Sequence, residues 1–391
     1  MDLCSASYGT AGAKWLRQSF FCFYGDIVGS TIGGCPGSRD YAEEQTKLVK
    51  TGSMELQYAE NFAVDYYEDG YKMLTTLPDS KRYLLVPEGQ PVPRGLDEDV
   101  SILQEPLQNI YLVASGVMDM FASLDAVDQI RFSGQKQENW YIQTAKDAMA
   151  AGDMIYAGKY SKPDYELLVS EGCDLAIENR MITHSPEVVE MLQSFDIPVM
   201  IEYSSYEQHP LGKVEWVKFF GALTGKEAEA EEAFAEQTEI LEKVESGEKT
   251  GKTIAFFYVT SNGLIQVRQS TDYIPKLIEL AGGRYIFEDL EDSGSGRSTL
   301  NMQVEDFYAG ARDADILIYN SSIDGGVTTL DELIGKCNIL KDFKAVQEGQ
   351  VYCTTNDMYQ QSMAIGYLLQ DMHTVLTDDD TAKLRYLFLL Q

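Results

Sequence analysis

The spacing of apolar and polar positions changes near residue 110. Before it, β-branched and aromatic residues concentrate in three short runs, which cover residues 54–67, 71–77 and 82–87. A Glu-Asp-Gly turn at residues 68–70 separates the first two runs, and such turn-forming residues between apolar runs are typical of β structure. We therefore predict a β-rich segment over residues 54–110.

After residue 110, short apolar runs alternate with amphipathic helical patterns. In a first unit the pattern predicts strands at 110–114, 128–132, 175–178 and 198–202, and helices at 117–124, 139–150, 164–171 and 186–195. From residue 252 a second unit predicts strands at 253–259, 315–319 and 350–353, and helices at 273–281, 330–339 and 363–376. Ser270 and Thr271 are candidate caps for the helix at 273. Strands that alternate with helices indicate parallel sheets covered by helices on both faces.

A long helical stretch separates the two units. It extends from about residue 212 to 246, with a break indicated at Thr224-Gly225. The fold class predicted is therefore α/β, with two Rossmann-like lobes joined by one long rigid helix and preceded by an N-terminal β-rich preamble. The corresponding domains are a signal-like and tether-like segment at 1–53, an N-terminal lobe with the preamble at 54–212, a linking helix at 213–248 and a C-terminal lobe at 249–391.

Composition excludes several classes of function. The 391 residues contain 31 Lys+Arg and 62 Asp+Glu, for a formal net charge of −31. A protein this acidic repels phosphate backbones and anionic membrane surfaces, so we expect no nucleic-acid partner and no basic membrane patch. Hydrophobic residues make up 44% of the chain, which is enough for a sizeable core. Any anionic ligand would need a local group of cations to offset the negative electrostatic potential of the protein.

The N-terminal residues follow the order of a bacterial lipoprotein signal. Lys14 and Arg17 precede a partly apolar stretch, small residues follow it, and Cys35 comes before a polar tether. Lipidation of Cys35 would anchor the protein at an extracytoplasmic membrane surface. Asp26 interrupts the apolar stretch, so a start without any signal remains the alternative. No run approaches the 18 apolar residues of a transmembrane helix.

The sequence contains no compact catalytic or metal motif. The three histidines lie far apart, and neither a GxSxG motif, a GxGxxG motif nor a phosphate-binding loop occurs. We therefore predict no catalytic residues, no metal site and no resident cofactor.

Candidate ligand-binding residues follow the strands of both units, because open α/β sheets bind ligands beyond the carboxyl ends of their strands. The candidates combine aromatic walls with two cations, and they are Trp140, Tyr141, Arg180, Tyr203, Tyr206, Arg268, Met358 and Tyr359. Each has a plainer alternative: the arginines could form surface ion pairs, and the aromatic residues could belong to the core. His209 could bind a metal centre, but with Pro210 it could equally begin the long helix.

Five local patterns resemble the substrate-binding proteins of bacterial ABC importers for iron–siderophore complexes, haem and cobalamin. They are the strand and helix at residues 109–115 and 118–124, the helix and strand at 162–168 and 173–177, and the segments at 195–199, 220–230 and 277–283 with 311–319. The resemblance covers about residues 54–380. It departs from the family at residues 171–174, which replace a proline-containing turn, and in the long preamble.

The resemblance implies a transport function without chemistry. The lobes would hold an iron complex, either a siderophore or haem, in the cleft between them, and a monomeric protein would deliver it to an ABC permease and its ATPase. Glu166 and Glu305 match the surface glutamates, one on each lobe, that dock on permease arginines in this family. Arg180 and Arg268 would hold carboxylate or catecholate oxygens of the ligand.

Three other functions stay open at this point. A cobalamin or corrinoid could replace the iron complex as cargo. A two-lobed α/β reductase-like enzyme would share the doubled sheet, but it would need clustered cysteines or a phosphate loop. A binding protein for bare zinc or manganese would need several converging His, Asp or Glu ligands.

Overall fold

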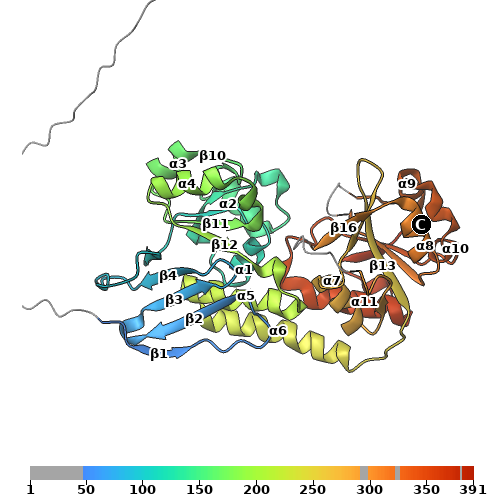
Figure 1. Cartoon of the computed structure of the whole chain (residues 1–391), viewed down its shortest axis with the longest axis horizontal. Helices are drawn as coiled ribbons and strands as arrows, with labels where there is room; N and C mark the ends of the chain where they lie inside the picture. Colours follow the sequence, from blue (N-terminus) through green and yellow to red (C-terminus); the bar gives the residue numbers. More distant parts are fainter. Residues whose placement is uncertain (1–46, 291–297, 322–325, 379–380) are drawn as a thin grey trace, which may run out of the picture. The chain divides into compact units, whose positions relative to one another are not determined.

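The computed structural model describes residues 47–290, 298–321, 326–378 and 381–391 (Figure 1). The predicted fold class is confirmed: a β-rich preamble precedes two α/β lobes, and a helix links the lobes. Cys35 and the signal-like residues up to 46 lie outside the described residues. Within the described ranges, no helix has both the length and the apolar character needed to cross a bilayer.

The preamble is a five-stranded sheet in sequence order. Its strands are β1 (Lys50–Ser53), β2 (Phe62–Tyr67), β3 (Lys72–Thr76), β4 (Lys81–Val86) and β5 (Val100–Gln104). Neighbouring strands are antiparallel except β4 and β5, which are parallel. Alternation of side chains gives the sheet two apolar faces. One face joins the main core, and the other forms a small cluster with Tyr71, Met73, Leu84 and Val86.

The first predicted run of the preamble is only partly a strand. Residues 54–61 are irregular and β2 begins at Phe62, whose ring centroid lies 4.9 Å from that of Trp216. The backbone N–H groups of residues 57–61 donate to the carboxylates of Glu215 and Glu207 instead of to a neighbouring strand. In this stretch, side-chain carboxylates rather than a neighbouring strand accept the backbone N–H hydrogen bonds. The apolar pattern of the sequence cannot reveal such contacts.

The N-terminal lobe contains a parallel sheet of order β12-β11-β6-β7-β8. These strands are β6 (Ile110–Leu112), β7 (Ile130–Ser133), β8 (Ile155–Tyr156), β11 (Leu175–Asn179) and β12 (Val199–Glu202), and a hairpin of β9 (Gly158–Lys159) and β10 (Lys162–Pro163) lies outside the sheet. The helices of this lobe are α1 (Val117–Ser123), α2 (Gln143–Ala151), α3 (Tyr165–Ser170) and α4 (Pro186–Ser194). Two apolar clusters cover the two sheet faces: residues of α1 and α2 pack on one and residues of α3 and α4 on the other.

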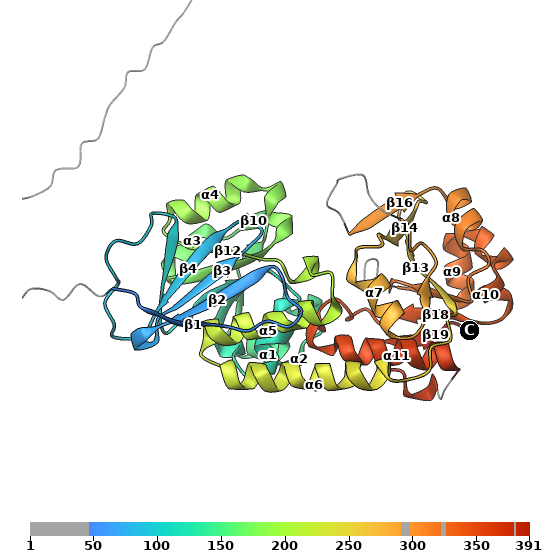
Figure 2. The ribbon, with the colours of Figure 1, turned by 60° about the horizontal axis from the view of Figure 1, so that its bottom comes forward.

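The long helical stretch consists of two helices, because the indicated break is present at Gly225. Gly225 adopts a left-handed φ of 72° between α5 (Pro210–Thr224) and α6 (Glu227–Glu245). α5 is buried along nearly its whole length and belongs to the core. α6 links the lobes: it lies beside α5, and its Gln237 Oε1 accepts the N–H of Gly366 in the C-terminal lobe at 2.9 Å (Figures 1 and 2).

The C-terminal lobe contains a mixed sheet of order β16-β14-β13-β17-β18-β19, with β15 also paired to β13. The strands are β13 (Thr253–Val259), β14 (Ile265–Arg268), β15 (Arg284–Tyr285), β16 (Thr299–Met302), β17 (Ile316–Tyr319), β18 (Val351–Thr354) and β19 (Leu387–Leu389). The helices are α7 (Tyr273–Leu280), α8 (Val304–Ala311), α9 (Leu330–Lys336), α10 (Lys344–Gln347) and α11 (Ile365–Thr377). Residues of α7 and α11 pack on one face, and residues of α8, α9 and α10 on the other.

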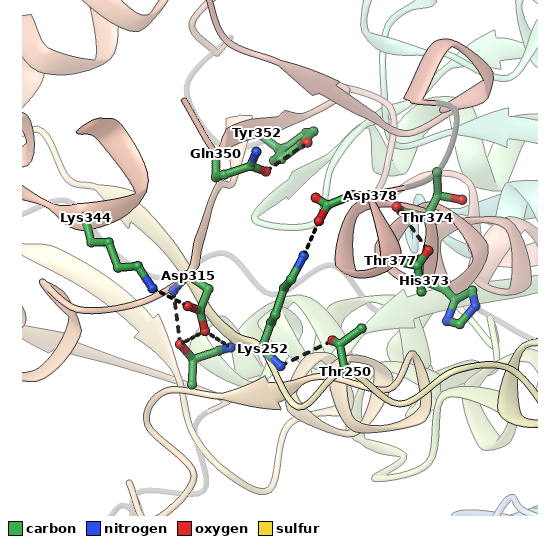
Figure 3. A network of polar contacts seen from close by, with 11 residues as sticks. Thr250, Lys252, Asp315, Lys344, Gln350, Tyr352, His373, Thr374, Thr377 and Asp378 are labelled. Atoms are coloured by element: carbon green, nitrogen blue, oxygen red, sulfur yellow. Dashed lines mark hydrogen bonds and ion pairs between the residues drawn. The ribbon is translucent and has the colours of Figure 1, made fainter. Parts of the chain in front are cut away.

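Polar contacts join the strand beginnings of this lobe to its helices. Figure 3 shows Lys344 at Asp315 and Lys252 at Asp378, and both ion pairs measure 2.6 Å. Burial raises the pKa of Asp315, but hydrogen bonds from Lys344 and Thr253 outweigh it and lower the pKa overall. The carboxylate thereby ties the start of β13 to the start of β17.

The cap of α7 differs from the prediction. Asp272, rather than Ser270 or Thr271, is the N-cap, and its Oδ1 accepts the N–H of Ile274 at 3.0 Å. Asp serves as well as Ser at this position, so residue preference alone could not choose among three neighbours.

Candidate functional site

In the C-terminal lobe, two predicted ligand-binding residues that are 91 positions apart in the chain contact each other. The Arg268 guanidinium lies 5.5 Å from the ring centroid of Tyr359 and donates a hydrogen bond to its hydroxyl oxygen. The same oxygen accepts a hydrogen bond from Asn320 Nδ2 at 2.7 Å. Asn320 follows the parallel strand β17, whereas Arg268 ends β14, which runs antiparallel to β13, so strands of opposite direction bring these two groups to Tyr359.

Buried groups hold Arg268 in place. Its Nη1 lies 3.4 Å from Asp272 Oδ2, and the Tyr285 hydroxyl both donates to the Arg268 carbonyl and accepts from its N–H. Only 8% of Arg268 is exposed, and burial raises the pKa of Asp272 although the nearby guanidinium opposes this. The arginine is therefore a rigid donor held in place by groups of the protein itself. Asp272 and Tyr285 were not predicted, because their roles depend on tertiary packing around Arg268.

In the N-terminal lobe, a second arginine lies against a second predicted tyrosine. The Arg180 guanidinium is 4.4 Å from the ring centroid of Tyr206, and 39% of this tyrosine is exposed. Arg180 directly follows β11, where Asn179 Oδ1 accepts the N–H of Met181 and shapes the turn. A guanidinium that lies over a phenol ring gives a partly exposed surface that is both cationic and aromatic.

The other candidates lie in different surroundings. Trp140 is 1% exposed and its indole N–H donates to Ser133 Oγ at 3.0 Å. Met358 and Tyr203 are also buried in the main core, and burial raises the pKa of Tyr203 to about 12. Tyr141 is 48% exposed, and Lys146 Nζ lies 5.8 Å from its ring centroid. The structure thus pairs four of the eight candidates, leaves Tyr141 at the surface and buries three. Their roles toward a ligand remain predictions.

A pocket of about 350 Å³ lies between the two lobes. Its lining residues are Tyr58, Glu60, Gln208, His209, Ser270, Thr271, Asp272 and Lys276. None of the eight candidates lines this pocket, but Asp272, the partner of Arg268, does.

His209 is a helix cap on one wall of this pocket. Its ring stacks on Tyr58 at 4.4 Å, and its Nδ1 accepts the N–H of Leu211 at the start of α5. Burial, and then the Lys276 charge, lower the pKa of His209. Of the two interpretations open from the sequence, the structure supports the beginning of the helix. No three His, Cys, Asp or Glu side chains converge to hold a metal ion within the described parts of the chain.

The two candidate docking glutamates are both exposed. Glu166 is in the first turn of α3 and Glu305 in the first turn of α8. Neither forms an ion pair with a residue that the structure describes, so both carboxylates are available to an outside partner.

Comparisons with solved structures agree with this architecture. A possible iron-binding, periplasmic solute-binding protein from Staphylococcus epidermidis matches 69% of this chain and 98% of its own, with a TM-score of 0.54 and 18% identity. The periplasmic heme-binding protein HutB of Vibrio cholerae matches 68% of this chain and 98% of its own, with a TM-score of 0.54 and 15% identity. At these identities the likeness concerns the fold.

Sequence comparisons extend over more of the chain. An uncharacterized lipoprotein of Methanocaldococcus jannaschii is 24% identical over 93% of this chain and 92% of its own length. The sequence model of the periplasmic binding protein family matches residues 112–358, which span β6 to the loop after β18 and leave the preamble sheet outside. Proteins of this family bind substrates for transport, and the chain belongs to the periplasmic binding protein family.

Proposed function

We propose that this chain is an extracytoplasmic substrate-binding protein that captures an iron complex, a siderophore or haem, between its lobes and delivers it to an ABC permease. The observation that carries the proposal is the presence of two arginine–tyrosine pairs, Arg268–Tyr359 and Arg180–Tyr206, at strand ends of the two lobes. Lipidation of Cys35 would keep the protein at the membrane.

The chemistry of the two pairs suits an anionic aromatic chelate. Guanidinium groups donate hydrogen bonds in a planar fork that fits carboxylate or catecholate oxygens, and the tyrosine rings offer flat apolar contact. A net charge of −31 opposes anion binding everywhere except where cations gather. Arg180 lies beside an exposed ring, which favours its contact with a ligand, whereas Arg268 is buried beside Asp272.

Binding can be tested with a panel of ferric siderophores, haem and cobalamins, followed by thermal shift and tryptophan quenching. A true ligand at a hundredfold excess over Kd should raise the free energy of unfolding by about 2.7 kcal/mol. Stabilisation by a cobalamin alone would replace the iron complex as cargo. Absence of any response across the panel would overturn the proposal.

A matched pair of variants localises the binding. Tyr206→Ala removes the ring beneath Arg180, and Tyr156→Ala removes another exposed tyrosine of the same lobe, which is 40% exposed. We expect affinity for the responding ligand to fall about tenfold or more in Tyr206→Ala and to stay unchanged in Tyr156→Ala. Equal affinities in the two variants would exclude the Arg180–Tyr206 pair from the site.

A further inference from the structure

Residues 359–363 of the C-terminal lobe cross to the N-terminal lobe. The segment begins at Tyr359, the partner of Arg268, and ends where Ser362–Ala364 forms a 3₁₀ turn ahead of α11. Three features of this segment contact the N-terminal lobe: the amide of Gln360, the N–H of Met363 and the side chain of Ser362.

Gln360 uses both ends of its side-chain amide across the lobe boundary. Its Oε1 accepts the backbone N–H of Tyr141 at 2.8 Å, and its Nε2 donates to the backbone carbonyl of Asn139 at 2.8 Å. A glutamine amide offers one donor side and one acceptor side, as a peptide group does. Gln360 therefore pairs with the 139–141 backbone much as a neighbouring strand would, although more than 200 residues separate them.

Asp119 provides a second contact between the lobes. This α1 carboxylate accepts the N–H of Met363 at 2.7 Å. The first N–H groups of a helical segment have no partner within the segment, so a carboxylate from another element satisfies one of them. Asp119 of the N-terminal lobe thus caps the 3₁₀ turn of the C-terminal lobe.

Gly116 allows the segment to approach this closely. A Cβ atom at residue 116 would lie 2.8 Å from Ser362 Oγ and 3.4 Å from the Tyr359 carbonyl oxygen. The φ of Gly116 is −69°, so its backbone does not itself require glycine. Glycine is required at residue 116 because a larger side chain would not fit between the two lobes.

We propose that residues 359–363 are an interlobe clasp, in which Gln360 and Asp119 act as positioning residues that fix the spacing of the lobes and hold Tyr359 against Arg268. The spacing itself is a property of the ligand-free chain. A fixed spacing would also help the lobes to retain a ligand held between them. That consequence alone rests on the proposed function.

Lobe spacing can be measured by pulsed electron paramagnetic resonance without any ligand. Spin labels are attached through p-acetylphenylalanine at Glu190 on α4 and at Lys341 after α9, both exposed, so that the native cysteines stay in place. We expect Gln360→Ala to shift or broaden the distance distribution. Gln361→Ala is the matched control, because among the described residues the Gln361 side-chain amide donates to Asp357 in its own loop, and it should leave the distribution unchanged.

Hydrogen exchange supplies a local measurement on the same proteins. Loss of the Gln360 amide should speed exchange at the Tyr141 N–H by about tenfold or more, while the denaturation midpoint stays close to that of the parent. Exchange at Tyr141 and a distance distribution that both match the parent in Gln360→Ala would overturn the clasp.

Gly116→Ala and two Asp119 variants test the clasp without removing Gln360. The added methyl of Gly116→Ala should force Ser362 away and open the lobes although each polar group remains. Asp119→Asn keeps an acceptor for the Met363 N–H and should behave like the parent, whereas Asp119→Ala should resemble Gln360→Ala. Parent-like spacing in both Gly116→Ala and Asp119→Ala would contradict the proposal. The interlobe distances and the exchange rates are measured without a ligand. A ligand panel without any response would therefore not change their interpretation.

Discussion

Two regions of the N-terminal lobe bury carboxyl groups in opposite ways. Where the preamble meets α5, the Glu215 carboxylate is fully buried and accepts the N–H groups of Gln57, Tyr58 and Ala59 at 2.8–3.1 Å. On β11, Glu178 is equally buried, and neither of its oxygens has a hydrogen-bond partner among the described residues. Burial of a carboxyl group costs most free energy when its hydrogen bonds to water are not replaced. We therefore expect Glu215, called the preamble anchor below, to stabilise the fold and Glu178 to destabilise it.

The consequence for Glu178 is a shift of its ionisation. Its position two residues after Ala176 turns it toward the apolar cluster beneath α3 and α4. Burial raises the pKa of Glu178 to about 8, so the group is mainly protonated at neutral pH. Where the preamble meets α5, by contrast, several N–H donors surround each of the carboxylates of Glu215 and Glu207.

The largest expected effect is the loss of the Glu215 anchor. Glu215→Ala leaves the N–H groups of residues 57–59 without acceptors and removes a carboxylate 3.6 Å from the buried Lys218 Nζ. Breaking such a buried set should lower the free energy of unfolding by about 3–5 kcal/mol in a urea titration. Glu231→Ala removes the exposed partner of the same lysine and should cost less than about 1 kcal/mol. Similar losses in both variants would refute the anchor.

Replacing Glu178 should stabilise the protein, which is the reverse effect. The folded pKa is raised above the unfolded value of 4.5, so stability is greatest below pH 4.5 and falls as the pH rises toward about 8. At pH 7 the pKa difference corresponds to about 3 kcal/mol, and Glu178→Leu should recover much of it. Glu178→Gln should remove the pH slope while keeping a polar group. A slope between pH 5 and 8 that is the same in the parent and both variants would exclude this explanation.

Glu207 tests the anchor at a smaller scale. It accepts the N–H groups of Glu60 and Asn61 and the indole N–H of Trp216, at 2.9–3.0 Å. Glu207→Gln keeps its volume but turns an NH₂ toward one of these donors, so we expect a loss of about 1–2 kcal/mol in the free energy of unfolding. Trp216→Phe in the Glu207→Gln background should cost less than in the parent, because the two side chains share one hydrogen bond.

Most of the fold could be predicted because apolar periodicity is a local signal. The predicted strand at 253–259 coincides with β13, and the alternation of strands and helices gave both lobes. The strands β14 and β16 were missed because their patterns are short and polar. The groups that surround Arg268 at the end of β14 include Tyr285 and Tyr359, and Tyr359 lies far away in the chain.

The candidate site was harder to predict than the fold. Arg268 and Tyr359 were candidates because they follow the predicted strands at 253–259 and 350–353. Arg268 instead ends β14, which runs antiparallel to β13, so the rule for parallel strands does not explain its place. Trp140 lies at the start of a helical pattern, where either a core or a cleft position fits the sequence, and its burial beside Ser133 in the structure distinguishes them. Gln360 carries no local signal at all, because its partners are defined by the docking of one lobe on the other.

The smallest effect on stability is expected for the exposed glutamates Glu166 and Glu305. Neither has a partner among the described residues, so replacing both by alanine should change the free energy of unfolding by less than about 0.5 kcal/mol. If the two carboxylates register the protein on arginines of its permease, the double variant should keep its affinity for the ligand found by the panel and yet lose at least tenfold in cellular uptake. Glu190→Ala, an exposed glutamate of α4, is the matched control and should support uptake like the parent. Unchanged uptake in the double variant would exclude Glu166 and Glu305 from docking on the permease.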